Sequence, residues 1–70
     1  MRFGCGTEVQ VTAQSGVSVR GVVIEANDIE FIIQDEKGKN VCIAWDLELT
    51  GQCDFRLIST EKSIYLKNAA

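Results

Sequence analysis

Apolar side chains alternate with polar ones along most of this chain, with a period of two residues. Between residues 7 and 13 ("TEVQVTA") the apolar positions are Val9, Val11 and Ala13. Successive side chains of a β-strand point to opposite sides, so this alternation is typical of a strand with one buried face. No window of about 11 residues has the spacing of an amphipathic helix. The pattern therefore predicts an all-β chain.

Residues 17–26 form the longest predicted strand and are rich in β-branched side chains. Val17, Val19 and Val23 share one face with Gly21. Beyond Gly21 both faces are apolar, which indicates a strand that bends and passes between the two halves of a sheet. A glycine in the middle of a strand permits such a bend.

Residues 29–34, 41–50 and 55–59 complete the predicted strands. The first of these has its apolar face at Ile29, Phe31 and Ile33. The second alternates without interruption and has its apolar face at Val41, Ile43, Trp45, Leu47 and Leu49. Its opposite face carries Asp46 and Glu48, which we expect to be solvated.

Short polar stretches join these strands and predict tight turns. Gly16 and Gly38 occupy turn positions that favour positive φ. Asn27-Asp28 predicts another turn, because both residues tolerate the left-handed backbone and hydrogen-bond to their own main chain.

Five or six short strands in 70 residues favour a small all-β barrel, because an open sheet of this size leaves its edges and much apolar surface exposed. We expect a single domain over residues 1–70. Residues 60–70 form either a last edge strand, with Ile64 and Leu66 inward, or a single helical turn.

Composition argues against several kinds of chemistry. The chain has no histidine, which is the usual general base and the commonest metal ligand. Cys5, Cys42 and Cys53 lack the C-x-x-C spacing of a zinc site. The glycines stand singly at bends and turns, so no phosphate-binding loop is present. We therefore expect no enzyme activity, no cofactor and no metal.

Ten acidic and seven basic residues give a net charge of −3. This balance disfavours broad contact with nucleic-acid backbones and favours a partner with a basic surface. We expect no membrane segment, because no stretch reaches the roughly 18 apolar residues that a spanning helix needs. Three widely spaced cysteines and no apolar leader fit a cytoplasmic protein whose thiols are free and mostly buried.

Gly16, Val19 and Gly21 form the pattern G-x-x-V-x-G, which resembles the opening of the Sm motif of the Sm and Hfq RNA-binding proteins. In that family the two glycines flank a strongly bent strand. An aspartate normally follows six residues after the second glycine, where this chain has Asn27 and then Asp28. The resemblance implies an SH3-like or Sm-like barrel of five to six strands.

The resemblance covers residues 9–57 and has consequences for function. It implies a homo-oligomeric ring whose subunits join edge strand to edge strand, with RNA at the loops near Asn27-Asp28 and Thr50-Gly51. The family motif has an arginine before its last glycine, where this chain has Thr50. The basic character of the family is also missing, so the fold is implied more strongly than the uridine-binding pocket.

Three further residues are candidates for binding. Trp45 is either a core residue whose indole N–H reaches a carbonyl, or part of a groove that stacks a nucleic-acid base or grips a partner's side chain. Arg20 either pairs with Glu25 or Glu30 across the hairpin, or contacts a carboxylate or phosphate of a partner. Tyr65, near the end of the chain, is available to a partner.

These observations favour a non-enzymatic binding module. We expect a small accessory or regulatory protein that binds another protein through an edge strand or an apolar groove. The alternative is an Sm-like, RNA-binding ring subunit, which the acidic balance disfavours.

Overall fold

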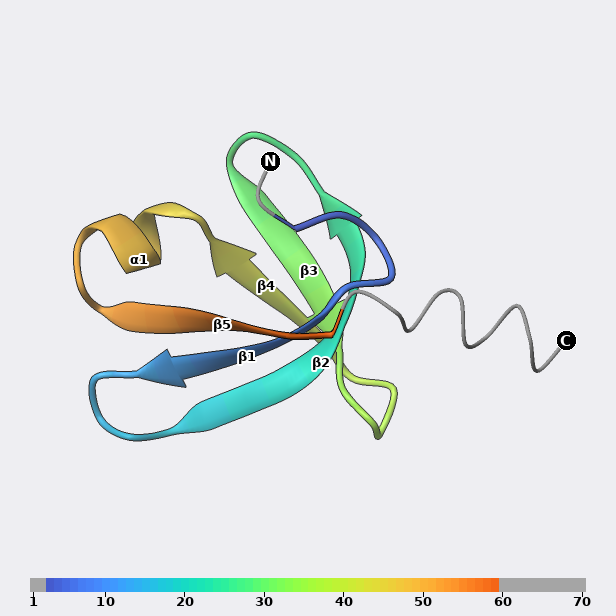
Figure 1. The fold of residues 1–70 in the computed structure, drawn as a ribbon, viewed down its shortest axis with the longest axis horizontal. Helices are drawn as coiled ribbons and strands as arrows, with labels where there is room; N and C mark the ends of the chain where they lie inside the picture. Colours follow the sequence, from blue (N-terminus) through green and yellow to red (C-terminus); the bar gives the residue numbers. More distant parts are fainter. Residues whose placement is uncertain (1–2, 60–70) are drawn as a thin grey trace, which may run out of the picture.

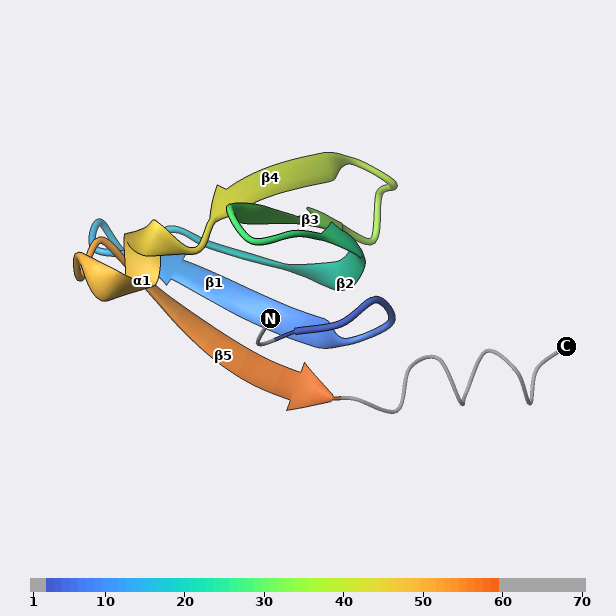
Figure 2. The same ribbon diagram turned by 90° about the horizontal axis from the view of Figure 1, so that it is seen from above.

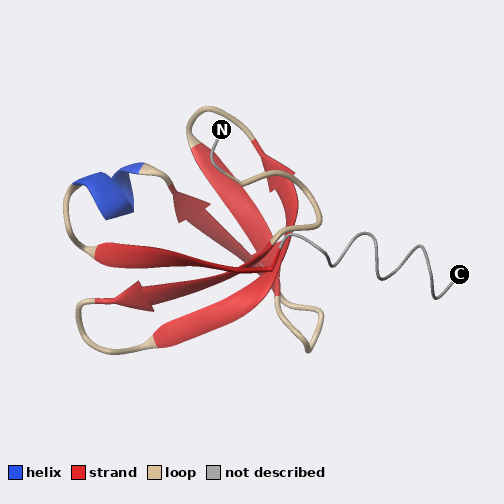
Figure 3. Ribbon diagram, viewed as in Figure 1, coloured by secondary structure: helices blue, strands red, loops and turns tan. Residues whose placement is uncertain are grey.

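The computed structural model describes residues 3–59, which form five strands and one short helix (Figures 1 and 3). In chain order these elements are β1 (Glu8–Ala13), β2 (Ser18–Ala26), β3 (Glu30–Gln34), β4 (Asn40–Ala44), α1 (Asp46–Leu49) and β5 (Cys53–Ser59). The all-β prediction is confirmed. Tyr65 and the element expected over residues 60–70 lie outside the described residues.

All five strands belong to one antiparallel sheet in the order β4-β3-β2-β1-β5. β4 and β5 form its two edges and lie on opposite sides in Figure 2, with β3, β2 and β1 between them. Over the described residues, the sheet is therefore open, and the closed barrel that the sequence predicted is not observed. The cause is the early end of β4, because the residues after Ala44 turn into α1 instead of continuing along the edge.

The predicted strand over residues 41–50 is wrong in its second half. β4 ends at Ala44, and the helix α1 contains both Asp46 and Glu48, which the alternation had placed on one strand face. Leu47 packs against the core, whereas Leu49 is 82% exposed. Alternation could not reveal this, because four residues are too few to show a helical period.

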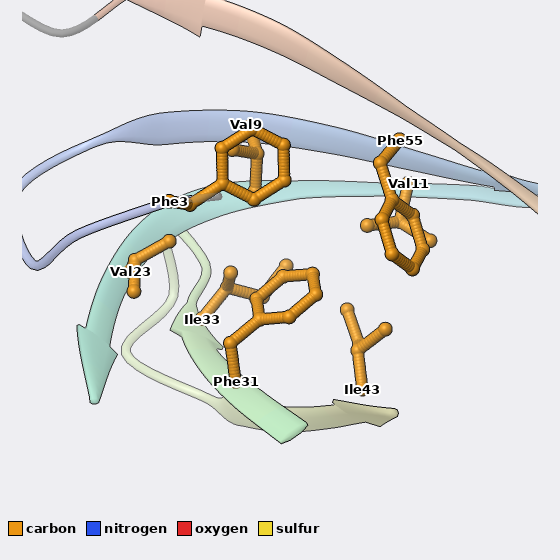
Figure 4. Packing of buried hydrophobic residues seen from close by; sticks show 8 residues of the cluster. All are labelled: Phe3, Val9, Val11, Val23, Phe31, Ile33, Ile43 and Phe55. Atoms are coloured by element: carbon orange, nitrogen blue, oxygen red, sulfur yellow. The ribbon is translucent and has the colours of Figure 1, made fainter. Parts of the chain in front are cut away.

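β2 is bent, as its glycine and its two apolar faces predicted, and it carries a bulge (Figure 4). Its pairing with β3 shifts in register between Val23 and Glu25. At Gly21, the backbone of β3 approaches so closely that a Cβ would lie 2.5 Å from the carbonyl oxygen of Gln34. Gly21 thus lets β2 and β3 come together at the bend.

The core lies between the two halves of the bent sheet (Figure 4). Its buried members are Phe3, Val9, Val11, Val23, Phe31, Ile33, Ile43 and Phe55. Phe31 is at the centre, with its ring 4.4 Å from Trp45 and 5.3 Å from Phe55 between centroids. Phe3 joins this cluster from the segment before β1, which backbone hydrogen bonds tie to Val23.

Besides Leu49, two further residues predicted on inward faces are exposed instead. Val17 and Ile29 are 69% and 74% exposed. Each directly precedes its strand and belongs to the turn, so its side chain does not follow the pleat. The alternation assigned the faces within these two strands correctly, but it predicted that each strand begins one residue too early.

The close approach at Gly21 gives a testable prediction. Replacing Gly with Ala in a strand normally stabilises slightly, because the unfolded chain loses conformational freedom. We expect Gly21→Ala to do the opposite and to lower the free energy of unfolding by about 1–3 kcal/mol, because the methyl group collides with main chain. Urea denaturation measures the change.

Gly4→Ala is the matched control. A Cβ there meets no atom within 4 Å, so we expect a change within about 0.5 kcal/mol. Equal urea midpoints for the two variants would contradict the packing at Gly21.

Candidate functional site

Among residues 3–59, β5 is an edge of the sheet and pairs with β1 on one side. The amide N–H of Gln14 donates to the carbonyl of Gln52 (3.0 Å), and hydrogen-bonded and non-hydrogen-bonded pairs alternate from there along β5. In this alternation the N–H and C=O groups of Cys53 and Leu57 point away from β1. Both residues therefore present backbone groups to an added strand.

Leu57 also presents apolar surface at this edge. It is in register with Val9, which is fully buried, yet Leu57 is 51% exposed. On the opposite face of β5, Asp54 and Arg56 alternate with the inward residues and are exposed. The β5 edge thus combines an apolar side chain, backbone N–H and C=O groups that point away from β1, and charges of both signs.

Trp45 belongs to the core, as one of its two interpretations predicted. Its ring contacts Phe31, Phe3 and Phe55, and its indole N–H donates to the carbonyl of Asn27 at 2.6 Å. The side chain is half-buried. Ring contacts and the N–H hydrogen bond together fix the orientation of the indole. The hydrogen bond links the end of β4 to the β2–β3 turn.

Asn27 forms the β2–β3 turn through its side chain. Its Oδ1 accepts hydrogen bonds from the amides of Ile29 (2.8 Å) and Glu30 (2.9 Å). The expected left-handed backbone is absent, since no described residue other than glycine has positive φ. The side-chain hydrogen bonds shape this turn instead. Asp28 is exposed beside it and accepts neither bond.

Arg20 pairs with a different acid from those expected. Its Nε donates to Oε2 of Glu8 at 3.0 Å, rather than to Glu25 or Glu30. Arg20 lies opposite Gln10 in the β1–β2 register, so Glu8 is its diagonal neighbour on the same face. Glu25 and Glu30 lie near the β2–β3 turn, at the other end of β2, so they are too far along the strand to reach Arg20.

Arg20 lies in a half-open depression between β2 and residues 34–37. The depression is lined by Glu8, Ser18, Val19, Arg20, Gly21, Val22, Ile24, Gln34, Asp35, Glu36 and Lys37. Acidic and basic groups are mixed, and Arg20 is already paired there. This arrangement has no convergent set of donors for an anion.

Thr50 has a structural role at the end of α1. Its Oγ1 donates to the carbonyl of Asp46 (3.1 Å) and accepts from the side-chain amide of Gln52 (3.1 Å). Gly51 follows with a φ of 78°, which is typical of the residue after a helix. Among the sequence candidates within residues 3–59, the structure brings Trp45 to the Asn27-Asp28 turn through the Asn27 carbonyl, whereas Arg20 and Thr50 are engaged elsewhere.

All three cysteines are free, as expected, but they are not mostly buried. Cys5 and Cys42 are exposed and Cys53 is half-buried. The prediction failed because Cys42 lies on the outer face of an edge strand, where a small apolar side chain can face solvent. A hydrogen bond to Glu30 raises the pKa of the Cys42 thiol, and desolvation and the negative charges of Glu30 and Glu25 act in the same direction.

Neither a metal site nor a membrane helix is found in residues 3–59. No three His, Cys, Asp or Glu side chains of this part gather closely enough to hold a metal ion. Its helix, α1, has four residues, and no helix there is long and apolar enough to cross a bilayer.

The sequence candidates omitted the residues of the β5 edge, and Leu57 is the most informative of them. Its strand was predicted without an assignment of its faces, and an apolar residue within a strand gives no sign of exposure. Only the position of β5 at the edge of the sheet reveals it.

Comparison with known proteins gives no relative for this chain. No family model, no curated protein and no solved structure matches it.

The contrast between Asn27 and Asp28 gives a second prediction. We expect Asn27→Ala to lower the free energy of unfolding by about 1–2 kcal/mol, because two turn amides lose their acceptor. Asp28→Ala is the control and changes stability by no more than about 0.5 kcal/mol. Thermal or urea unfolding distinguishes them, and equal losses would show that the Asn27 side chain does not hold the turn.

Proposed function

We propose that this chain is a non-enzymatic binding module that docks an extended segment of another protein along β5. The half-exposed Leu57 at an edge strand is the observation that carries the proposal. An added strand gains main-chain hydrogen bonds at the outward-pointing positions, and alternate side chains give specificity. One apolar side chain of the partner covers Leu57.

Charge indicates the chemistry of this partner. The chain has a net charge of −3, so a basic protein is attracted over distances of about one Debye length. At the docking edge, Asp54 is exposed on the outer face and offers an acceptor for a lysine or arginine of the added strand. The partner segment is therefore extended, with apolar residues on one face and a basic residue on the other.

The finer fold and the location belong to the same proposal. The bent strand β2, which follows Gly16 and contains Gly21, supports an SH3-like or Sm-like architecture. The free thiols of Cys5 and Cys42 are exposed and persist most readily in a reducing compartment, which supports a cytoplasmic, accessory or regulatory protein.

Leu57→Pro tests the docking edge. The N–H of Leu57 points away from β1, so proline leaves the β1–β5 hydrogen bonds in place and blocks the added strand. Wild type and variant are immobilised and incubated with lysate, and the retained partner is quantified by mass spectrometry. We expect the variant to retain about tenfold less partner than wild type, or less still.

Val17→Ala is the matched control, because it shortens an exposed apolar side chain in the β1–β2 turn. It should retain the partner at the wild-type level. Leu57→Ala keeps the backbone N–H but shortens the side chain. We expect it to retain about fivefold less partner than wild type, which measures the contribution of the side chain alone. Equal retention by wild type and Leu57→Pro would refute docking at β5.

A nucleic-acid-binding ring subunit is the second candidate. It is favoured by the contact between Asn27 and Trp45, which brings the β2–β3 turn to the junction of β4 and α1. In this proposal, single-stranded RNA stacks near Trp45, and the ring forms by pairing of strand edges.

Titration of Trp45 fluorescence with short oligoribonucleotides tests this candidate. The chain has one tryptophan, so its emission reports directly on the turn. The candidate requires a change that saturates at low salt and weakens as salt rises. We expect no change at about 20 mM salt, where electrostatic attraction is least screened. A saturable change would favour the ring.

A further inference from the structure

β4 is the other edge of the sheet and carries no charged residue. Its sequence is Asn40-Val41-Cys42-Ile43-Ala44. It pairs with β3 on one side in unbroken register, and within residues 3–59 no strand pairs with its other side (Figure 2). Natural proteins usually protect an edge with lysine, proline or a bulge. β4 has none of these, so its edge is open to another strand.

The backbone groups of β4 that face outward can be assigned. The amide of Asp35 donates to the carbonyl of Lys39 (2.9 Å), and the amide of Trp45 donates to the carbonyl of Ile29 (3.1 Å). These two hydrogen-bonded pairs lie at opposite ends of the β3–β4 ladder. Hydrogen-bonded and non-hydrogen-bonded pairs alternate between them, and counting from either end gives the same assignment. It follows that Asn40, Cys42 and Ala44 direct their N–H and C=O groups away from β3.

We propose that two copies of this chain pair β4 with β4, antiparallel, about a two-fold axis at Cys42. In one register only, all three outward-facing residues of each copy are paired. This register sets Cys42 opposite Cys42 of the second copy and Asn40 opposite Ala44 of the second copy. Each of these facing pairs forms two backbone hydrogen bonds. The two sheets then continue into one another.

Side chains on both faces of β4 fit this register. On the inner face, half-buried Val41 lies opposite buried Ile43 of the second copy, so the apolar cores meet across the axis. On the outer face, only small uncharged side chains meet. The same patch serves both copies, which is what a two-fold interface requires.

Charges beyond the ends of β4 are complementary in this arrangement. Because the two β4 strands are antiparallel, the β3–β4 turn of one copy lies beside the start of α1 in the second copy. This end of the turn carries Lys37 and Lys39. Extending the register by one step places Lys39 opposite Trp45, next to exposed Asp46. The two-fold axis makes this contact twice. No like charges face each other along the strand.

The interface is short, so we expect a weak dimer. Interfaces below about 1,200 Å² belong to transient complexes, and their dissociation constants are commonly micromolar or weaker. Sedimentation equilibrium between about 1 and 500 µM covers that range. We expect a concentration-dependent dimer for wild type and for Cys42→Ser.

Cys42→Lys is the disrupting variant. It places two ammonium groups face to face on the axis, and we expect dimerisation at least about tenfold weaker. Cys5→Lys, at another exposed cysteine, is the matched control and should dimerise normally. Lys39→Glu should weaken the dimer, and adding Asp46→Lys to it should restore the dimer in part.

Cross-linking gives an independent measurement of the register. Facing Cα atoms in a hydrogen-bonded antiparallel pair are about 5.5 Å apart, within the range of a disulfide. With copper-phenanthroline and oxygen, two Cys42 thiols form one S–S bond, and two electrons and two protons pass to oxygen, giving peroxide. The Glu30 hydrogen bond raises the pKa of this thiol, so a mildly alkaline buffer is used. We expect a Cys42–Cys42 dimer on non-reducing gels, absent in Cys42→Ser.

Leu57→Pro separates this proposal from docking at β5, because the β4 dimer should survive that change. A monomer at all concentrations would overturn the proposal. So would an oligomer that Cys42→Lys leaves intact, or one that Leu57→Pro abolishes, since the latter requires β5.

Discussion

The close approach of β2 and β3 at Gly21 is the constraint on which the rest of the structure depends. A side chain there would collide with the carbonyl of Gln34. With glycine, β2 can bend and hold β1 and β5 on one side of the core and β3 and β4 on the other. Phe31 is buried between these halves, among Phe3, Trp45 and Phe55. In so short a chain this one aromatic cluster supplies much of the buried apolar area.

The same bend determines which surfaces remain for binding. It leaves β4 and β5 as the two edges of the sheet, and within residues 3–59 neither pairs with the other. The edges differ in character. β5 has a half-exposed leucine and charges on its outer face, whereas β4 is uncharged. A foreign segment of matching chemistry suits the first edge, and a second copy of the same strand suits the other. The two proposals therefore use different surfaces and can hold together.

The sequence candidates were better guides to structure than to binding. Asn27 was predicted at a turn, Trp45 within a strand, and Thr50 at the position of a motif arginine, and each is engaged within the described part of the chain. Arg20 is paired with Glu8. Residues with strong local hydrogen-bonding capacity attract attention for function, yet in a small domain they are needed to end strands and shape turns. The surfaces proposed for binding are instead made by ordinary strand residues at the edges of the sheet.

Alternation by itself determined that the chain is built of strands, the inward faces of β1 and β3, and the bend at a mid-strand glycine. These are local properties, because successive side chains of a strand must point in opposite directions. Tertiary structure alone decided that β4 ends before Trp45, that Glu8 pairs with Arg20, and that Leu57 and Cys42 are exposed. Each of these depends on which strand lies beside which, and on where the sheet has no neighbour. Hydrogen bonds between distant segments set that arrangement, and a pattern along one strand contains no information about them.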